Sequence, residues 1–173
     1  MIEKGKISQE PFIEILKTLE EAESANLIDW NAMNIASVDQ MNQPSSRMVL
    51  LKKISDDGLV FYTNYNSRKG KEIELNPKVA VNFWWRELKK QIRVEGFIEK
   101  ASEEDSDDYF YSRPLKSRVS AIISNQSSKI SSYEDLTNQI DNYLEQNDES
   151  SIKRPDHCGL YIVIPNAVEF WEE

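Results

Sequence analysis

The chain has 173 residues, 39% hydrophobic and 29% charged, which is enough to bury a substantial core without disulfides or metals. Its net charge of −9 argues against nucleic acid as a main partner, and no apolar run approaches the roughly 20 residues of a membrane span. No signal peptide is visible, and the single cysteine, Cys158, excludes an internal disulfide, so we expect a cytoplasmic protein with no membrane partner.

The cations are concentrated in the middle of the chain. Residues 47–118 contain 15 Lys and Arg against 12 Asp and Glu, whereas the rest of the chain contains 6 against 18. A cation-rich segment can bind a small anion locally while the protein as a whole repels polyanions. A solvated surface of mixed charge explains several of these lysines equally well.

The first predicted element is a helix over about residues 8–25, which Ser8 would cap and whose apolar residues follow helical spacing. Short apolar runs separated by turn residues then predict strands, two of them joined by the hairpin turn Asp56-Asp57-Gly58. A short helix over 67–75 ends at Asn76-Pro77. The strands predicted in this part of the chain are 32–39, 46–54, 59–64, 79–85 and 91–100.

A helical segment is predicted next, over about residues 102–146. Two Ser-x-x-Asp patterns, beginning at Ser102 and Ser132, have the spacing of helix-start caps, and Pro114 limits helix formation between them. A loop follows, and the last two predicted strands form a hairpin about Pro165-Asn166. These closing strands are 159–164 and 167–171.

This order of elements predicts an α+β fold, in which a single domain is built on an antiparallel β-barrel, closed or nearly closed, with peripheral helices. The barrel would use about residues 31–100 and 158–171. The alternating pattern of a doubly wound nucleotide-binding fold is absent, and the five scattered glycines form no phosphate-binding loop. Any phosphate must therefore be bound by side chains.

Arg68 and Lys69 mark a candidate anion site. They stand at the predicted start of the 67–75 helix, directly after an apolar strand, where positive charge opposes the helix dipole. Two adjacent cations in this position predict a bound anion, and phosphate is the usual one.

Short motifs along the chain carry a family resemblance. They occupy residues 31–33, 44–52, 61–65, 67–70, 91–96, 109–114, 124–127, 154–157 and 169–171. Together they resemble the pyridoxamine (pyridoxine) 5′-phosphate oxidase family of flavoproteins. Any one tetrapeptide would be weak, but the motifs follow the family's order and cover nearly the whole chain.

The resemblance implies an FMN-binding split β-barrel that works as a homodimer, with FMN in clefts between the subunits. The positions that match the family's FMN contacts are Arg47, Met48, Val49, Leu50, Leu51, Lys52, Tyr62, Thr63, Arg68, Lys69, Gln91, Gln126, Ser127 and Trp171. The basic members of this set suit the phosphate, and the glutamines suit the mixed donors and acceptors of the flavin. Backbone groups of Met48–Leu51 could form hydrogen bonds with the edge of the flavin ring, as the backbone of an edge strand does with a neighbouring strand.

The same resemblance carries four positions over to the substrate. They are Lys52, Tyr109, Arg113 and Ser117. The last three are spaced i, i+4 and i+8, which would align them on one face if the segment were helical, and their side chains suit a phosphate. The alternative makes Tyr109 a core aromatic residue and Arg113 a surface ion-pair residue.

The implied reaction moves hydride from C4′ of pyridoxine or pyridoxamine 5′-phosphate to N5 of FMN, and O2 then reoxidises the flavin to yield hydrogen peroxide. The alcohol substrate gives pyridoxal 5′-phosphate directly, whereas the amine substrate gives an imine that water hydrolyses to the same aldehyde with release of ammonia. No catalytic side chain and no metal site are predicted, and His157 is interpreted as structural rather than as a base or a partner for Cys158. Two alternatives stay open. One is an FMN-dependent oxidoreductase of the same fold acting on another small molecule, such as a phenazine precursor, and the other is a non-catalytic flavin-binding protein.

The chain departs from the family pattern at several positions. The family commonly has Arg at Leu115, Gly at Ser120, and Trp at Ile122 and Cys158, so packing beside the cofactor can differ. The family also continues beyond Glu-Phe-Trp with a basic tail containing Arg-Leu-His, whereas this sequence ends at Glu172-Glu173. Two expectations stay open here: the protein lacks the tail, or the sequence is clipped before it.

Overall fold

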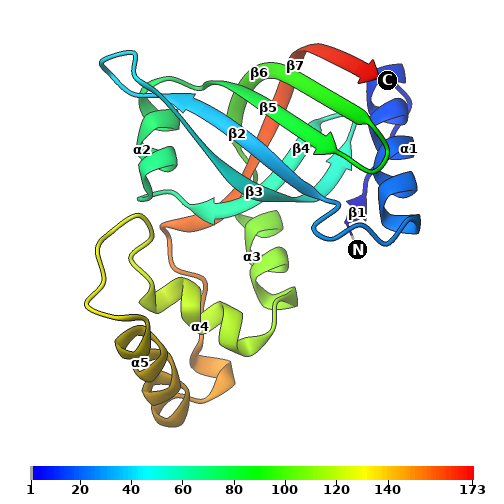
Figure 1. The fold of residues 1–173 in the computed structure, drawn as a ribbon. Coiled ribbons are helices and arrows are strands. Elements are labelled where there is room, and N and C mark those ends of the chain that lie inside the picture. The colour runs from blue at the N-terminus through cyan, green and yellow to red at the C-terminus, as the bar shows by residue number, and fades with distance from the viewer. Residues whose placement is uncertain (1) are drawn as a thin grey trace. The chain divides into compact units, whose positions relative to one another are not determined.

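The computed structural model describes residues 2–173 and contains a closed antiparallel barrel of six strands, with one further short strand (Figure 1). The strands are β1 (Glu3–Lys4), β2 (Ala32–Val38), β3 (Pro44–Ser55), β4 (Gly58–Asn64), β5 (Lys78–Trp85), β6 (Lys90–Lys100) and β7 (Cys158–Glu172). The order around the barrel is β3-β2-β5-β6-β7-β4, pairing of β4 with β3 closes it, and β1 adds to β3 in parallel. The predicted fold class is confirmed.

Five α-helices lie within residues 2–173: α1 (Glu10–Ser24), α2 (Arg68–Leu75), α3 (Glu103–Ser112), α4 (Leu115–Ile123) and α5 (Tyr133–Gln146). The chain divides into two compact units. The barrel unit comprises the residues up to 62 together with 72–100 and 161–173, and the helical unit comprises 63–71 and 101–160. Among the described residues, no helix is both long enough and apolar enough to cross a bilayer.

Alternating apolar residues fill the barrel, because successive side chains of a strand point to opposite faces of the sheet. In β5 every second residue is buried, from Val79 to Trp85. Leu51 and Phe61 are register partners on β3 and β4, and both are fully buried. The ring of Phe61 packs against Tyr161 of β7 with centroids 5.8 Å apart. Removal of these side chains from water is the main term that favours the closed barrel.

The predicted closing hairpin is wrong, because Cys158–Glu172 is one continuous strand that pairs with β6 from Lys90 to Lys100. The register shifts beside Gly96, so that Pro165-Asn166 forms a bulge instead of a turn. Gly96 permits the close approach of the two strands at the bulge. A Cβ atom at this position would lie 2.1 Å from the carbonyl oxygen of Ile164.

The predicted Ser8 cap of the first helix is also wrong. α1 begins at Glu10 after Gln9, and Ser8 instead binds Asp56 in the turn between β3 and β4, its Oγ donating to the carboxylate at 2.5 Å. The backbone N–H groups of Ser8 and Gln9 donate to the same carboxylate. These bonds, led by the Ser8 hydroxyl, lower the pKa of Asp56 below its ordinary value.

The helical unit is held by helix caps and by buried guanidinium groups, among them that of Arg154. Both predicted serine caps are confirmed, since Ser102 and Ser132 each accept a hydrogen bond from the N–H three residues further on, at 3.0 and 2.9 Å. Arg154 donates to Asp107 of α3 at 2.7 Å and to the Cys158 carbonyl at 2.6 Å. These contacts join α3 to the segment that leads into β7.

Candidate functional site

Arg47 of β3 has its guanidinium held by polar side chains of the barrel unit. Nη1 donates to Ser37 Oγ at 2.6 Å, and Nη2 donates to Glu72 Oε2 at 3.1 Å and to Ser45 Oγ. The strand register pairs Ser37 with Ser45 and Arg47 with Ile35, so these side chains lie on one face of the sheet. The Arg47 side chain is 22% exposed, so it is held in place without being closed off from solvent.

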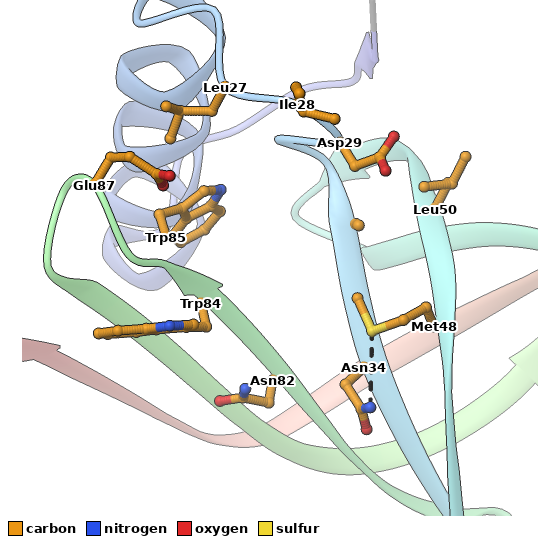
Figure 2. Close-up of a pocket in the computed structure, with 11 residues that line it drawn as sticks. Leu27, Ile28, Asp29, Asn34, Met48, Leu50, Asn82, Trp84, Trp85 and Glu87 are labelled. Carbon is orange, nitrogen blue, oxygen red and sulfur yellow. Dashed lines mark hydrogen bonds between the residues drawn. The ribbon is translucent and has the colours of Figure 1, made fainter.

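The residues after Arg47 alternate between the barrel interior and the surface. Val49 and Leu51 are buried, whereas Met48 and Leu50 are 59% and 41% exposed. The two exposed side chains line a hollow of about 660 Å³, to which Trp84 also contributes (Figure 2). In this predicted cofactor segment, the side chains of Met48 and Leu50 are therefore much more accessible to a ligand than those of Val49 and Leu51.

Gln91 and Trp171 lie side by side on the same barrel unit. The register places Trp84, Gln91 and Trp171 in one row across β5, β6 and β7. Gln91 Nε2 donates to Asn82 Oδ1 at 2.7 Å, and the rings of Trp84 and Trp171 are 6.1 Å apart. Gln91 and Trp171 also line a smaller hollow of about 190 Å³. Two predicted cofactor residues from distant segments are thus brought together.

Two further predicted residues of the barrel unit occupy strand positions. Lys52 is half-buried on β3, where the register with β4 shifts between Leu51 and Lys53. Tyr62 is half-buried near the end of β4. A bulge of this kind re-aims side chains, so the direction of Lys52 does not follow from strand alternation alone.

In the helical unit, Gln126 joins two predicted cofactor residues. Its Oε1 accepts hydrogen bonds from Lys69 Nζ at 3.0 Å and from Thr63 Oγ1 at 3.2 Å. Lys69 is buried and also donates to Ser67, whereas Arg68 is exposed at the first position of α2. The adjacent Ser127, also predicted, is exposed with a φ of 68°.

The predicted substrate residues do not share a continuous helix. Tyr109 lies on α3 and Ser117 on α4, but Arg113 between them is extended, with φ −79° and ψ 149°. Pro114 follows, which disfavours helix at Arg113, so alignment on one helical face is wrong. Burial raises the pKa of Tyr109, and the charge of Arg113 partly opposes this rise. Tyr109 and Arg113 are therefore electrostatically coupled.

The departures from the family pattern lie mostly on α4. Leu115 is its first residue, and Ser120 and Ile122 are half-buried further along it. Cys158 is 2% exposed, and its thiol lies 3.7 Å from the carbonyl oxygen of Ala121 on the same helix. The four departures therefore lie on α4 or, for Cys158, against it.

Sequence reasoning missed Glu72, the buried acceptor of the Arg47 cluster. Glu72 lies in a polar stretch of α2, where a charged residue is expected to be exposed to solvent. Ser37 carried a usable signal, because it continues the buried alternation of Met33 and Ile35 in β2. A serine at the third buried position of a strand indicates a polar partner inside the fold.

Comparison with known proteins finds relatives whose sequences align with nearly the full length of this chain. The family model described as pyridoxamine 5′-phosphate oxidase matches residues 19–144. A pyridoxine/pyridoxamine 5′-phosphate oxidase of Nostoc sp. is 47% identical over 96% of this chain and 78% of its own length. Pyridoxine/pyridoxamine 5′-phosphate oxidase 2 of Hydrogenovibrio crunogenus is 41% identical over 99% of this chain and 80% of its own length.

Two solved structures share the fold. PhzG from Burkholderia lata, in complex with tetrahydrophenazine-1-carboxylic acid, has a TM-score of 0.88 at 25% identity and covers 95% of this chain and 81% of its own. A pyridoxamine 5′-phosphate oxidase-related, FMN-binding protein from Nostoc punctiforme has a TM-score of 0.75 at 14% identity over 95% of this chain and 85% of its own. The matched family model and the relatives of 41–47% identity show that the chain belongs to the pyridoxamine 5′-phosphate oxidase family.

Proposed function

We propose that this chain is an FMN-dependent oxidase that converts pyridoxine or pyridoxamine 5′-phosphate to pyridoxal 5′-phosphate. The observation that carries the proposal is the 47% identity, over 96% of the chain, with a relative of that name. Because a fold alone does not define a function, the proposal also requires side chains that suit both molecules.

The donor set suits FMN in its chemistry. Arg47 is a fixed, partly exposed guanidinium that could bind phosphate, and Arg68 and Lys69 are further cations for the same group. Gln91 offers an amide, and Met48 offers exposed apolar surface for a flavin ring. The remaining proposed contacts are Val49, Leu50, Leu51, Lys52, Tyr62, Thr63, Gln126, Ser127 and Trp171.

We assign the substrate phosphate to Lys52, Tyr109, Arg113 and Ser117. A tyrosine phenol is protonated at neutral pH, and burial raises the pKa of Tyr109 further, so its O–H can donate a hydrogen bond to the phosphate. Bound FMN would supply the hydride acceptor for C4′, with O2 as the final oxidant and hydrogen peroxide as the second product. The side chains of this chain would bind and orient the substrate.

A homodimer and a cytoplasmic location belong to the same proposal. The barrel unit exposes large apolar side chains around the hollow, with Ile28 94%, Met48 59% and Trp84 50% exposed. A contiguous apolar surface of this kind marks an interaction site, and we assign a second copy of the chain to it. Cys158 is the single cysteine of the sequence and is buried, which fits a reducing compartment.

The test of the proposed reaction is aerobic turnover by FMN-loaded protein. Pyridoxine 5′-phosphate is added, and the formation of aldehyde and of hydrogen peroxide is followed in parallel. We expect aldehyde and hydrogen peroxide to form in equal molar amounts. Protein that binds FMN tightly but forms neither product would reject the substrate assignment.

A second candidate function is supported by the TM-score of 0.88 with PhzG, whose structure contains tetrahydrophenazine-1-carboxylic acid. The chain would then be an FMN-dependent oxidoreductase acting on a reduced phenazine precursor. Oxidation of that compound, without turnover of pyridoxine 5′-phosphate, would favour this function. Tight FMN binding with neither reaction would leave a non-catalytic flavin-binding protein.

A further inference from the structure

Glu72 is a buried carboxylate at the centre of a polar cluster in the barrel unit. Its side chain is 4% exposed, and one oxygen, Oε2, accepts hydrogen bonds from Ser37 Oγ at 2.5 Å, from Ser45 Oγ at 2.7 Å and from Arg47 at 3.1 Å. Both serine hydroxyls also accept a hydrogen bond from Arg47. Each serine therefore accepts from the guanidinium and donates to the carboxylate, and the directions of all five bonds agree.

The cluster holds only the terminal nitrogens of Arg47. The bonds that Arg47 makes within residues 2–173 use Nη1 and Nη2, and none uses Nε. The side chain also keeps 22% of its surface exposed. A guanidinium anchored in this way presents its remaining N–H and its charge in one fixed direction, as recognition of a phosphate requires.

Stability alone explains this cluster poorly. Burial of a carboxylate and a guanidinium carries a desolvation cost, and a well-packed apolar pair is often at least as stable. A cluster kept at such a cost fits a role in orienting a functional group. We propose that Glu72 is a positioning residue that sets the orientation of Arg47 toward the phosphate of bound FMN, an inference that rests on the proposed function.

The sign of the expected effect separates positioning from simple electrostatics. Removal of a negative charge near a bound phosphate would by itself strengthen phosphate binding. Loss of the shared acceptor would instead free the Arg47 side chain and weaken binding. Glu72→Ala therefore tests positioning, and Glu72→Gln, which keeps an oxygen acceptor but removes the charge, is the rescue variant.

The experiment titrates FMN and riboflavin separately into each apoprotein and follows flavin fluorescence. Riboflavin carries the same ring without the phosphate, and Glu74→Ala removes an exposed carboxylate from the same helix as a matched control. Glu72→Ala should weaken FMN binding about tenfold and leave riboflavin binding within about twofold of wild type. Glu72→Gln and Glu74→Ala should bind FMN at least as tightly as wild type.

A double-mutant cycle completes the test. If Glu72 acts through Arg47, adding Glu72→Ala to Arg47→Ala causes no further loss of FMN affinity. Additive losses, unchanged FMN binding by Glu72→Ala, or equal losses for FMN and riboflavin would each overturn the inference. Failure of the wild-type protein to bind FMN would instead overturn the proposed function, so the two failures are distinguishable.

Discussion

The two adjacent cations at the start of α2 have different surroundings. Lys69 is 6% exposed and donates to the side chains of Gln126 and Ser67, whereas Arg68 is exposed. Charge pattern alone treats them as one anion site. The structure separates a buried cation that organises neighbouring side chains from an accessible one that could bind an anion directly.

Replacement of Arg68 should therefore weaken cofactor binding without disturbing the fold. We expect Arg68→Ala to reduce FMN affinity by about 1.5–3 kcal/mol, the range for a hydrogen bond to a charged group. The measurement is a fluorescence titration of the apoprotein. Lys71→Ala is the matched control, since Lys71 is also an exposed cation of α2, and an equal loss in both variants would contradict a specific role for Arg68.

Replacement of Arg113 should affect the substrate rather than the flavin. Arg113 lies at the end of α3, where its charge acts on Tyr109. We expect Arg113→Ala to raise KM for the phosphorylated substrate at least about tenfold while the Kd for FMN stays within about threefold of wild type. Steady-state kinetics and FMN titration of the same preparation measure both quantities. A comparable loss of FMN affinity would show that the division into cofactor and substrate residues is wrong.

At the scale of elements, Asp56 joins the start of α1 to the β3–β4 turn and makes that junction sensitive to acid. Its pKa lies below the ordinary value near 3.8, so these bonds stabilise the fold at neutral pH and are lost as pH falls through the lowered pKa. We expect Asp56→Ala to lower Tm at pH 7, with the difference from wild type shrinking below about pH 4. Calorimetry of both proteins across pH 3–7 measures this difference in Tm. Ser8→Ala should reproduce part of the loss, and a difference independent of pH would contradict this role.

Local pattern predicted most elements, and the exceptions have physical causes. The ranges of β2 to β6 agree with the predicted strands to within a few residues, because turn residues bound each apolar run there. Pro165-Asn166 has turn composition but is absorbed as a bulge, since pairing along β6 and the absence of a Cβ at Gly96 decide the outcome. Ser8 has a cap composition but is recruited by a carboxylate far away in sequence. The local spacing of residues cannot predict a partner that lies so far away in the sequence.

For the candidate site, too, the sequence indicates which residue types could take part but not which side chains lie together. The family motifs place Gln91 and Trp171 among the expected FMN contacts, but only the strand register shows that the two residues are neighbours. Glu72 was missed because its burial depends on Arg47 and two serines from β2 and β3. Residue type predicts what a side chain can bind, whereas the sheet register determines which side chains meet.

At the scale of the whole molecule, the exposed apolar face of the barrel unit predicts self-association. Trp84 and Trp171 are 50% and 46% exposed and lie 6.1 Å apart, and such large aromatic side chains are enriched at the buried centre of interfaces. We expect wild-type protein to have twice the 20.1 kDa chain mass by light scattering, and Trp84→Glu to have the single-chain mass because it would bury a charge. Tyr133→Glu, at an 80% exposed aromatic residue of α5, is the control and should keep the wild-type mass. A single-chain mass for wild type, or a doubled mass for Trp84→Glu, would assign this face to a different role.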